Sequence, residues 1–114
     1  MQEINETPVF LKSYDLYKVL YEVVKKFGKS DRYSLGEKTK EKVLELIESI
    51  TKAGYAKAEW KVVQIEQAII TLELVKVFVR LAYDTNCVNE KQYLNLQERV
   101  QEIGRMLGGW KKSQ

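Results

Sequence analysis

The chain has 114 residues, 45% of them hydrophobic and 31% charged, which suits a single domain, residues 1–114, with a real core. It contains no histidine and only one cysteine, Cys87, which excludes histidine-dependent acid–base catalysis, an intramolecular disulfide and a structural zinc site. The formal net charge of +3 permits an acidic or nucleic-acid partner without requiring one.

The first six residues contain neither the basic segment nor the apolar segment of a signal peptide. No run of about 18 uncharged apolar residues occurs anywhere in the chain. We therefore expect a cytoplasmic protein without a membrane segment, whose residues 1–7 are disordered. Cys87 is expected to be a small residue in a turn between helices rather than a reactive thiol.

A first amphipathic helix is predicted over residues 9–27. Thr7 and Pro8 are typical of the N-cap and the first helical position, and Lys25, Lys26 and Gly28 indicate the end of the helix. The predicted buried stripe recurs every three or four residues and consists of Phe10, Tyr14, Tyr17, Leu20 or Tyr21, Val24 and Phe27. At this spacing Tyr14, Tyr17, Tyr21 and, in a later helix, Tyr93 favour core packing over a role in stacking on nucleic-acid bases.

The second predicted helix follows a short polar turn. Ser30 or Asp31 is expected to cap it, and Ala53-Gly54 ends it. Its apolar stripe comprises Leu35, Thr39, Val43, Leu46, Ile47 and Ile50, while the charged residues between them form a solvated outer face.

The third predicted helix, within residues 57–86, carries apolar residues nearly all the way round. They cover more than the single stripe that a surface helix needs, so we expect part of this helix to be buried against another copy of the chain. The remaining polar strip holds Glu66, Glu73, Lys76, Arg80 and Asp84. Ion pairs at helical spacing are the simplest account of this strip, and a contact with a partner or a cation is the alternative.

The fourth predicted helix begins after Asn89, a suitable N-cap. Its stripe has the three-and-four spacing of a heptad pattern and consists of Tyr93, Leu96, Val100, Ile103, Leu107 and Trp110. Four helices joined by short turns favour an all-α fold, an antiparallel up-down-up-down four-helix bundle.

Two features admit both a structural and a functional interpretation. In such a bundle one end gathers five lysines, which either complement helix dipoles or attract nucleic acid: Lys52, Lys57, Lys61, Lys111 and Lys112. The second feature is the glycine-rich end of the fourth helix, with Gly104, Gly108 and Gly109. These glycines allow either tight packing beneath Trp110 or the docking of a partner.

Three segments of the chain resemble a known family. They are Pro8-Val9-Phe10, Phe27-Gly28-Lys29-Ser30-Asp31-Arg32-Tyr33-Ser34-Leu35-Gly36 and Ile103-Gly104-Arg105-Met106-Leu107-Gly108-Gly109-Trp110. The chain is similar over nearly its whole length to the accessory variability determinant (Avd) proteins of diversity-generating retroelements. These belong to a wider four-helix-bundle family that includes proteins encoded in intervening sequences of large-subunit ribosomal RNA genes. Gly28 stands where many relatives have proline.

This resemblance implies a basic, non-enzymatic bundle that assembles into a homopentameric barrel, with no cofactor, metal or catalytic residue. It also implies association with a reverse transcriptase and with template RNA or an RNA–DNA hybrid during mutagenic cDNA synthesis. The residues that we expect to contact nucleic acid or a partner are Arg32, Lys76, Arg80, Arg105 and Lys111. The alternative function is that of a homo-oligomeric protein–protein interaction bundle of the intervening-sequence type, without a reverse-transcriptase partner. A carboxylate-dependent metalloenzyme is the third class, which metal analysis would detect.

Overall fold

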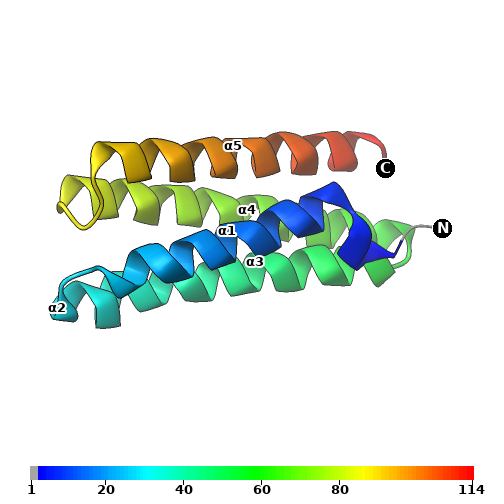
Figure 1. Cartoon of the computed structure of the whole chain (residues 1–114). Coiled ribbons are helices and arrows are strands. Elements are labelled where there is room, and N and C mark those ends of the chain that lie inside the picture. The colour runs from blue at the N-terminus through cyan, green and yellow to red at the C-terminus, as the bar shows by residue number, and fades with distance from the viewer. Residues whose placement is uncertain (1–2) are drawn as a thin grey trace.

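The computed structural model describes residues 3–114, and over that range the chain forms four long helices and no strand. They are α1 (Pro8–Lys25), α3 (Glu37–Tyr55), α4 (Ala58–Asp84) and α5 (Glu90–Lys112). The helices lie side by side in a rod of 43 × 22 × 21 Å (Figure 1). The start of α1 and the end of α5 lie at the end of the rod where α3 turns into α4.

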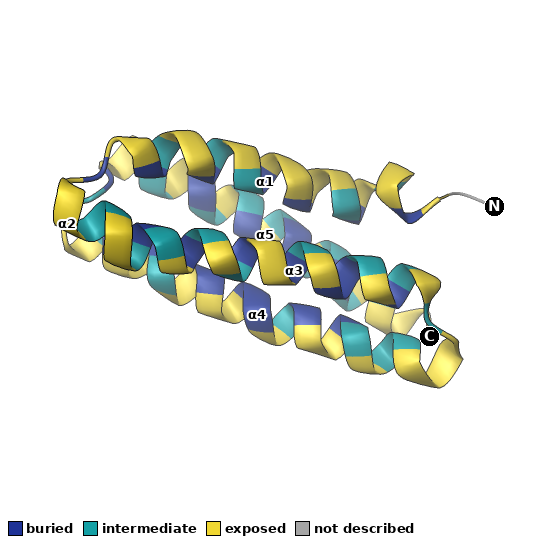
Figure 2. Cartoon of the chain, turned by 90° about the horizontal axis from the view of Figure 1, so that it is seen from below, coloured by how far each residue is buried: buried dark blue, intermediate teal, exposed yellow. Residues whose placement is uncertain are grey.

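The packing order around the rod is α1, α3, α4, α5. Helix α3 packs against both α1 and α4, and α5 packs against both α4 and α1, so α1 and α4 occupy opposite corners. Successive long helices run in opposite directions, and α1 and α4 therefore point the same way (Figure 1). Buried positions face inward on all four helices (Figure 2). The fully buried large side chains include Leu16, Leu20, Leu46, Ile50, Ile65, Leu96, Ile103 and Leu107.

Helix α5 confirms the pattern predicted for it. Asn89 is the N-cap, and its side chain accepts a hydrogen bond from the backbone N–H of Gln92 at 2.8 Å. The Gln92 side chain accepts one in return from the Asn89 backbone at 2.9 Å, which completes a capping box. The turn before it reverses at Asn86, whose φ of 63° lies in the left-handed region that asparagine tolerates.

The buried stripe of α1 differs from the predicted one. The buried residues are Val9, Ser13, Leu16, Leu20 and Val24, whereas Tyr14 and Tyr21 are exposed and Tyr17 is half-buried. The buried Ser13 hydroxyl donates a hydrogen bond to the backbone carbonyl of Val9 at 2.9 Å. The prediction that the tyrosines lie in the core was wrong for Tyr14 and Tyr21, because the aliphatic residues of the same helix fill the core and the tyrosine hydroxyls stay in water.

The expected disorder of residues 1–7 does not hold for the described part of that segment. Ile4–Glu6 form a short 3-10 helix, η1, and Ile4 is buried. A Cβ atom on Gly54 would overlap the Ile4 side chain, so this glycine makes room for the apolar residue that ties the segment to α3. Met1 and Gln2 lie outside the described residues.

The second predicted helix begins earlier than expected and is irregular. Helix α2 (Lys29–Asp31) leads through η2 (Arg32–Gly36), a stretch of π-helix, directly into α3. The N-cap is Gly28, not Ser30 or Asp31, which already lie within the helix. Gly36 is buried where η2 meets α1: a Cβ atom there would lie 2.6 Å from Cγ1 of Val24. The glycine thus lets the irregular turn pack closely on α1.

Gly28→Pro is expected to raise the free energy of unfolding by about 0.4–1 kcal/mol, because proline restricts the unfolded chain. Gly28 has φ −57° and ψ 152°, which a proline ring accepts, and within the described residues its N–H donates no hydrogen bond. Urea denaturation of the two proteins measures the difference. A lower free energy of unfolding in the variant would contradict the extended conformation assigned to this turn.

Candidate nucleic-acid interface

Two adjoining hollows form a groove along the surface where α4 meets α5. One has a volume of about 440 Å³ and the other about 340 Å³. The buried side chains of Leu72 and Val100 form the floor of the first hollow, and Gly104 and Gly108 line its α5 side. The exposed side chains of Val77 and Leu81 border the second hollow. We call this surface the α4–α5 groove.

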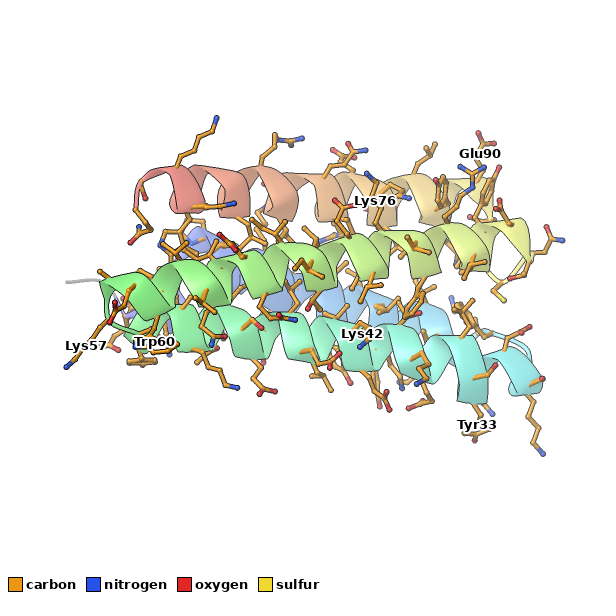
Figure 3. All side chains as sticks on the ribbon, turned by 180° about the vertical axis from the view of Figure 1, so that it is seen from behind. Tyr33, Lys42, Lys57, Trp60, Lys76 and Glu90 are labelled. Carbon is orange, nitrogen blue, oxygen red and sulfur yellow. The ribbon has the colours of Figure 1, made fainter. Side chains whose placement is uncertain are left out.

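Three of the five predicted contact residues line the α4–α5 groove. Lys76 borders both hollows, Arg105 borders the first and Arg80 the second. Figure 3 shows Lys76 on the side of α4 that faces α5. In the described part of the chain, neither Lys76 nor Arg105 has a hydrogen bond or an ion pair, so both charges are available to a partner.

Arg80 is held by an acidic neighbour one turn away. Its Nε donates to both carboxylate oxygens of Asp84, at 3.0 and 3.1 Å. This hydrogen bond, with a smaller contribution from Tyr93, raises the pKa of Arg80 above its usual value, so the guanidinium keeps its charge. The predicted ion pairing of the polar strip is confirmed for Arg80 and Asp84, whereas Glu73 and Lys76 form no ion pair within residues 3–114.

The other two predicted contact residues lie at opposite ends of the bundle. Arg32 opens the π-helical stretch, where its guanidinium lies 4.9 Å from the centre of the Tyr33 ring. Lys111 lies near the end of α5, 3.6 Å from a carboxylate oxygen of Glu66 on α4. The five residues therefore do not form one site, and only Lys76, Arg80 and Arg105 come together.

Most of the lysines expected at one end of the bundle have intramolecular partners. Lys52 pairs with Glu48 at 2.9 Å, and Lys61 donates to the carbonyl of Ala53 at 2.6 Å. With Lys111 engaged by Glu66, this end presents less free positive charge than the sequence suggests. Lys57 projects from the end of the bundle (Figure 3).

Comparison with known protein families finds a match over residues 9–114, which is nearly the whole chain. The matching family is described as bAvd-like. The chain belongs to the bAvd-like family. No curated protein matches the sequence. Within residues 3–114, no helix of this family member combines the length and the apolar character needed to cross a membrane.

The glycines at the end of α5, which lie inside the region matched to the bAvd-like family, are not explained by packing within the chain. A Cβ atom on Gly108 or Gly109 would meet nothing within 4 Å, and one on Gly104 would meet only Leu72, at an ordinary 3.5 Å. The sequence left two interpretations of these glycines open, tight packing beneath Trp110 and the docking of a partner. Tight packing is wrong for Gly108. Because Gly104 and Gly108 have no side chains, the α5 wall of the α4–α5 groove is low.

Sequence reasoning missed a second surface, the tyrosines of α1. Tyr14 is 51% exposed and Tyr21 is 42% exposed, and lysine side chains lie over both rings. Lys18 Nζ lies 5.6 Å from the centre of the Tyr14 ring, and Lys25 Nζ lies 4.5 Å from that of Tyr21. The sequence did contain a signal that these tyrosines lie outside the core. A second set of residues on α1 has the same helical spacing and is mostly aliphatic: Val9, Ser13, Leu16, Leu20 and Val24.

Proposed function

We propose that this bAvd-like protein is a non-enzymatic oligomeric scaffold that binds nucleic acid and a reverse transcriptase in retroelement-mediated mutagenesis. In this proposal the antiparallel bundle assembles into a ring, a homopentamer in keeping with the resemblance to Avd proteins. The α4–α5 groove contacts template RNA or an RNA–DNA hybrid. Membership of the bAvd-like family supports the accessory role.

The observation that carries the nucleic-acid part is the convergence of Lys76, Arg80 and Arg105 on one groove, where they outnumber the one carboxylate that lines it, Glu73. Two of these cations have no partner within the described chain, so they can neutralise phosphate groups without first breaking an ion pair. Repetition around a ring multiplies the net charge of +3 per chain and gives a larger positive field. The partner that this arrangement suits is a phosphate backbone rather than a particular base sequence.

Alanine substitution of Lys76 and Arg105 together is expected to weaken RNA binding and to flatten its dependence on salt. Removing one cation that binds a phosphate should reduce the slope of log affinity against log salt by about 0.7 for single-stranded RNA. Filter binding between low and high salt measures both quantities. Lys38→Ala/Lys91→Ala, which removes two exposed lysines that line neither hollow, is the matched control and should retain the wild-type slope. An unchanged slope in the groove variant, or no RNA binding by the wild-type protein, would overturn the assignment.

The reverse-transcriptase part rests on the family and has a separate test. A reverse-transcriptase gene beside the gene for this chain, with paired template and variable repeats, would support it, and co-purification of the two proteins would establish the contact. A gene set within a ribosomal RNA intervening sequence, with no such neighbour, would favour the interaction bundle of that type instead.

A further inference from the structure

An exposed apolar seam runs along α4 on the side away from the core. It consists of Trp60, Val63, Ile70, Leu74, Val77 and Leu81, and Ile70 and Val77 are 57% and 52% exposed. From Ile70 onward the members are spaced by four, three and four residues, the spacing by which one helix packs into a surface beside it. The expectation that α4 carries more apolar surface than its own chain covers is confirmed. We call this feature the α4 seam.

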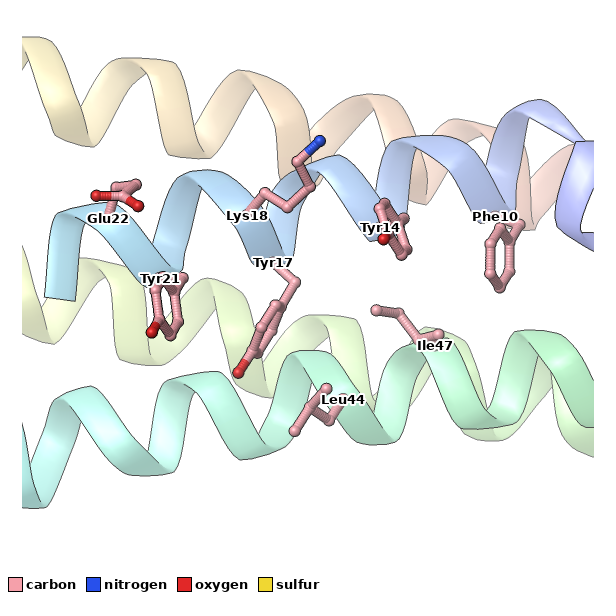
Figure 4. A pocket seen from close by; sticks show the side chains of 8 residues that line it. All are labelled: Phe10, Tyr14, Tyr17, Lys18, Tyr21, Glu22, Leu44 and Ile47. Carbon is pink, nitrogen blue, oxygen red and sulfur yellow. The ribbon is translucent and has the colours of Figure 1, made fainter. Parts of the chain in front are cut away.

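A complementary apolar hollow lies between α1 and α3. It has a volume of about 630 Å³ and is lined mainly by Phe10, Tyr14, Tyr17, Tyr21, Leu44 and Ile47. Figure 4 shows the aromatic rings reaching from α1 toward α3, with Leu44 and Ile47 rising from α3 between them. Lys18 and Glu22 stand at its α1 rim. We call this hollow the α1–α3 groove.

The α4 seam and the α1–α3 groove lie at the same height along the bundle. Gln67 and Thr71 of α4 share a hollow with Glu45 and Glu48 of α3, so this part of α3 is level with the middle of the seam. Leu44 and Ile47 flank the same part of α3 and belong to the α1–α3 groove. A second copy with the same orientation could therefore bring its seam to the groove without shifting along the bundle axis.

The charges beside the two surfaces are complementary in the same arrangement. Glu73 lies on the α5 side of the α4 seam, and Lys18 lies on the α1 side of the α1–α3 groove. When two copies with the same orientation meet seam to groove, the α5 side of the seam faces the α1 side of the groove. Within the described chain neither residue has an ion-pair partner, so each can form an intermolecular pair.

We propose that the α4 seam of one copy docks in the α1–α3 groove of a second copy, with Glu73 of the first beside Lys18 of the second. This inference rests on the self-association proposed above and assigns the surfaces that produce it. The contact joins two unlike surfaces, so each copy that has used one of them keeps the other free for a further neighbour. The groove opens between α1 and α3, whereas the seam points outward from α4 at the corner opposite α1. Because these directions are not opposed, repeated docking turns each copy relative to the last, which is the geometry that a closed ring requires.

Two variants test this interface, and both alter exposed side chains so that the bundle still folds. Ile70→Asp/Val77→Asp damages the seam, and Tyr14→Asp/Leu44→Asp damages the groove. Light scattering should find each variant monomeric alone and a heterodimer in an equal mixture, because the mixture contains one intact seam and one intact groove. Leu11→Asp/Leu94→Asp places the same charges on exposed leucines outside both surfaces and should retain the wild-type size.

Other outcomes would overturn the interface. Seam variants that are monomeric while groove variants stay assembled would indicate seam-to-seam pairing, and a mixture that stays monomeric would exclude the unlike contact. Groove variants that keep the wild-type size but fail to bind RNA would assign the tyrosines to nucleic-acid stacking instead. Val77 borders the α4–α5 groove as well as belonging to the seam, so the two proposals are separated by assembly. The Lys76/Arg105 variant should lose RNA affinity and keep the wild-type size, and a change in its size would show that the two surfaces are not independent.

The ion pair has its own readout in the same assay. Glu73→Lys and Lys18→Glu should each weaken assembly, and the two changes combined in one chain should restore it, since each junction then regains a pair of opposite charges. Glu98→Lys, on an exposed position of α5, is the matched control and should leave assembly unchanged. If assembly is weakened as much in the double variant as in the single variants, Glu73 and Lys18 do not pair across the contact.

Discussion

Leu16→Ala is expected to lower the free energy of unfolding of the bundle by about 2–5 kcal/mol, whereas Tyr14→Ala should change it by less than about 1 kcal/mol. Leu16 has 0% exposure and is enclosed by the other helices, so its truncation leaves a cavity as well as removing buried apolar surface. Tyr14, two residues away, is 51% exposed, and its ring packs on the neighbouring turn against Phe10 at a centroid distance of 6.1 Å.

Urea denaturation followed by circular dichroism measures both changes. The experiment is performed in the Ile70→Asp/Val77→Asp background, because there unfolding is not coupled to dissociation of the proposed ring. Similar destabilisation by the two substitutions would show that the tyrosine face of α1, and not the aliphatic face, lies inside the bundle. That outcome would also remove the α1–α3 groove as a docking surface.

The contrast between these two residues shows where sequence reasoning succeeds and where it stops. On α5 only one periodic set of apolar residues exists, so Leu96, Val100, Ile103 and Leu107 were predicted correctly as buried. On α1 two sets share the same spacing, one aromatic and one aliphatic, and spacing alone does not choose between them. The choice depends on the chemistry of the side chain: a tyrosine buried without a partner for its hydroxyl would lose hydrogen bonds to water.

The candidate site was predictable only in part for a similar reason. The spacing of Lys76 and Arg80 places both on one side of α4, which the sequence makes plain. Arg105 joins them only because α5 packs beside α4 in a particular register, and a sequence without its partner helix does not contain that register. The intramolecular partners of Lys61 and Lys111 depend on packing in the same way, which is why the basic end of the bundle was overestimated.

Glycine substitutions in two helical segments are expected to change stability in opposite directions. Gly36→Ala should lower the free energy of unfolding by about 1–3 kcal/mol, because the added methyl group overpacks a filled site. Its Cβ would lie 2.6 Å from Cγ1 of Val24 and 3.3 Å from the backbone oxygen of Asp31, and the backbone oxygen cannot move without distorting η2. Gly108→Ala should raise the free energy of unfolding by up to about 1 kcal/mol, since alanine is the better helix former and open space surrounds the new Cβ.

The two variants are compared by urea denaturation in the Ile70→Asp/Val77→Asp background. RNA binding by Gly108→Ala is tested in the otherwise wild-type chain, because Val77 borders the α4–α5 groove. Packing within the described chain does not require a glycine at position 108, and Gly108 lines the α4–α5 groove, where an added side chain would narrow the space for RNA. We therefore expect Gly108→Ala to be more stable than the wild type and yet to bind RNA more weakly. Greater stability with unchanged RNA binding would show that Gly108 is not part of the nucleic-acid interface. Lower stability would show that the packing of α5 requires a glycine at this position.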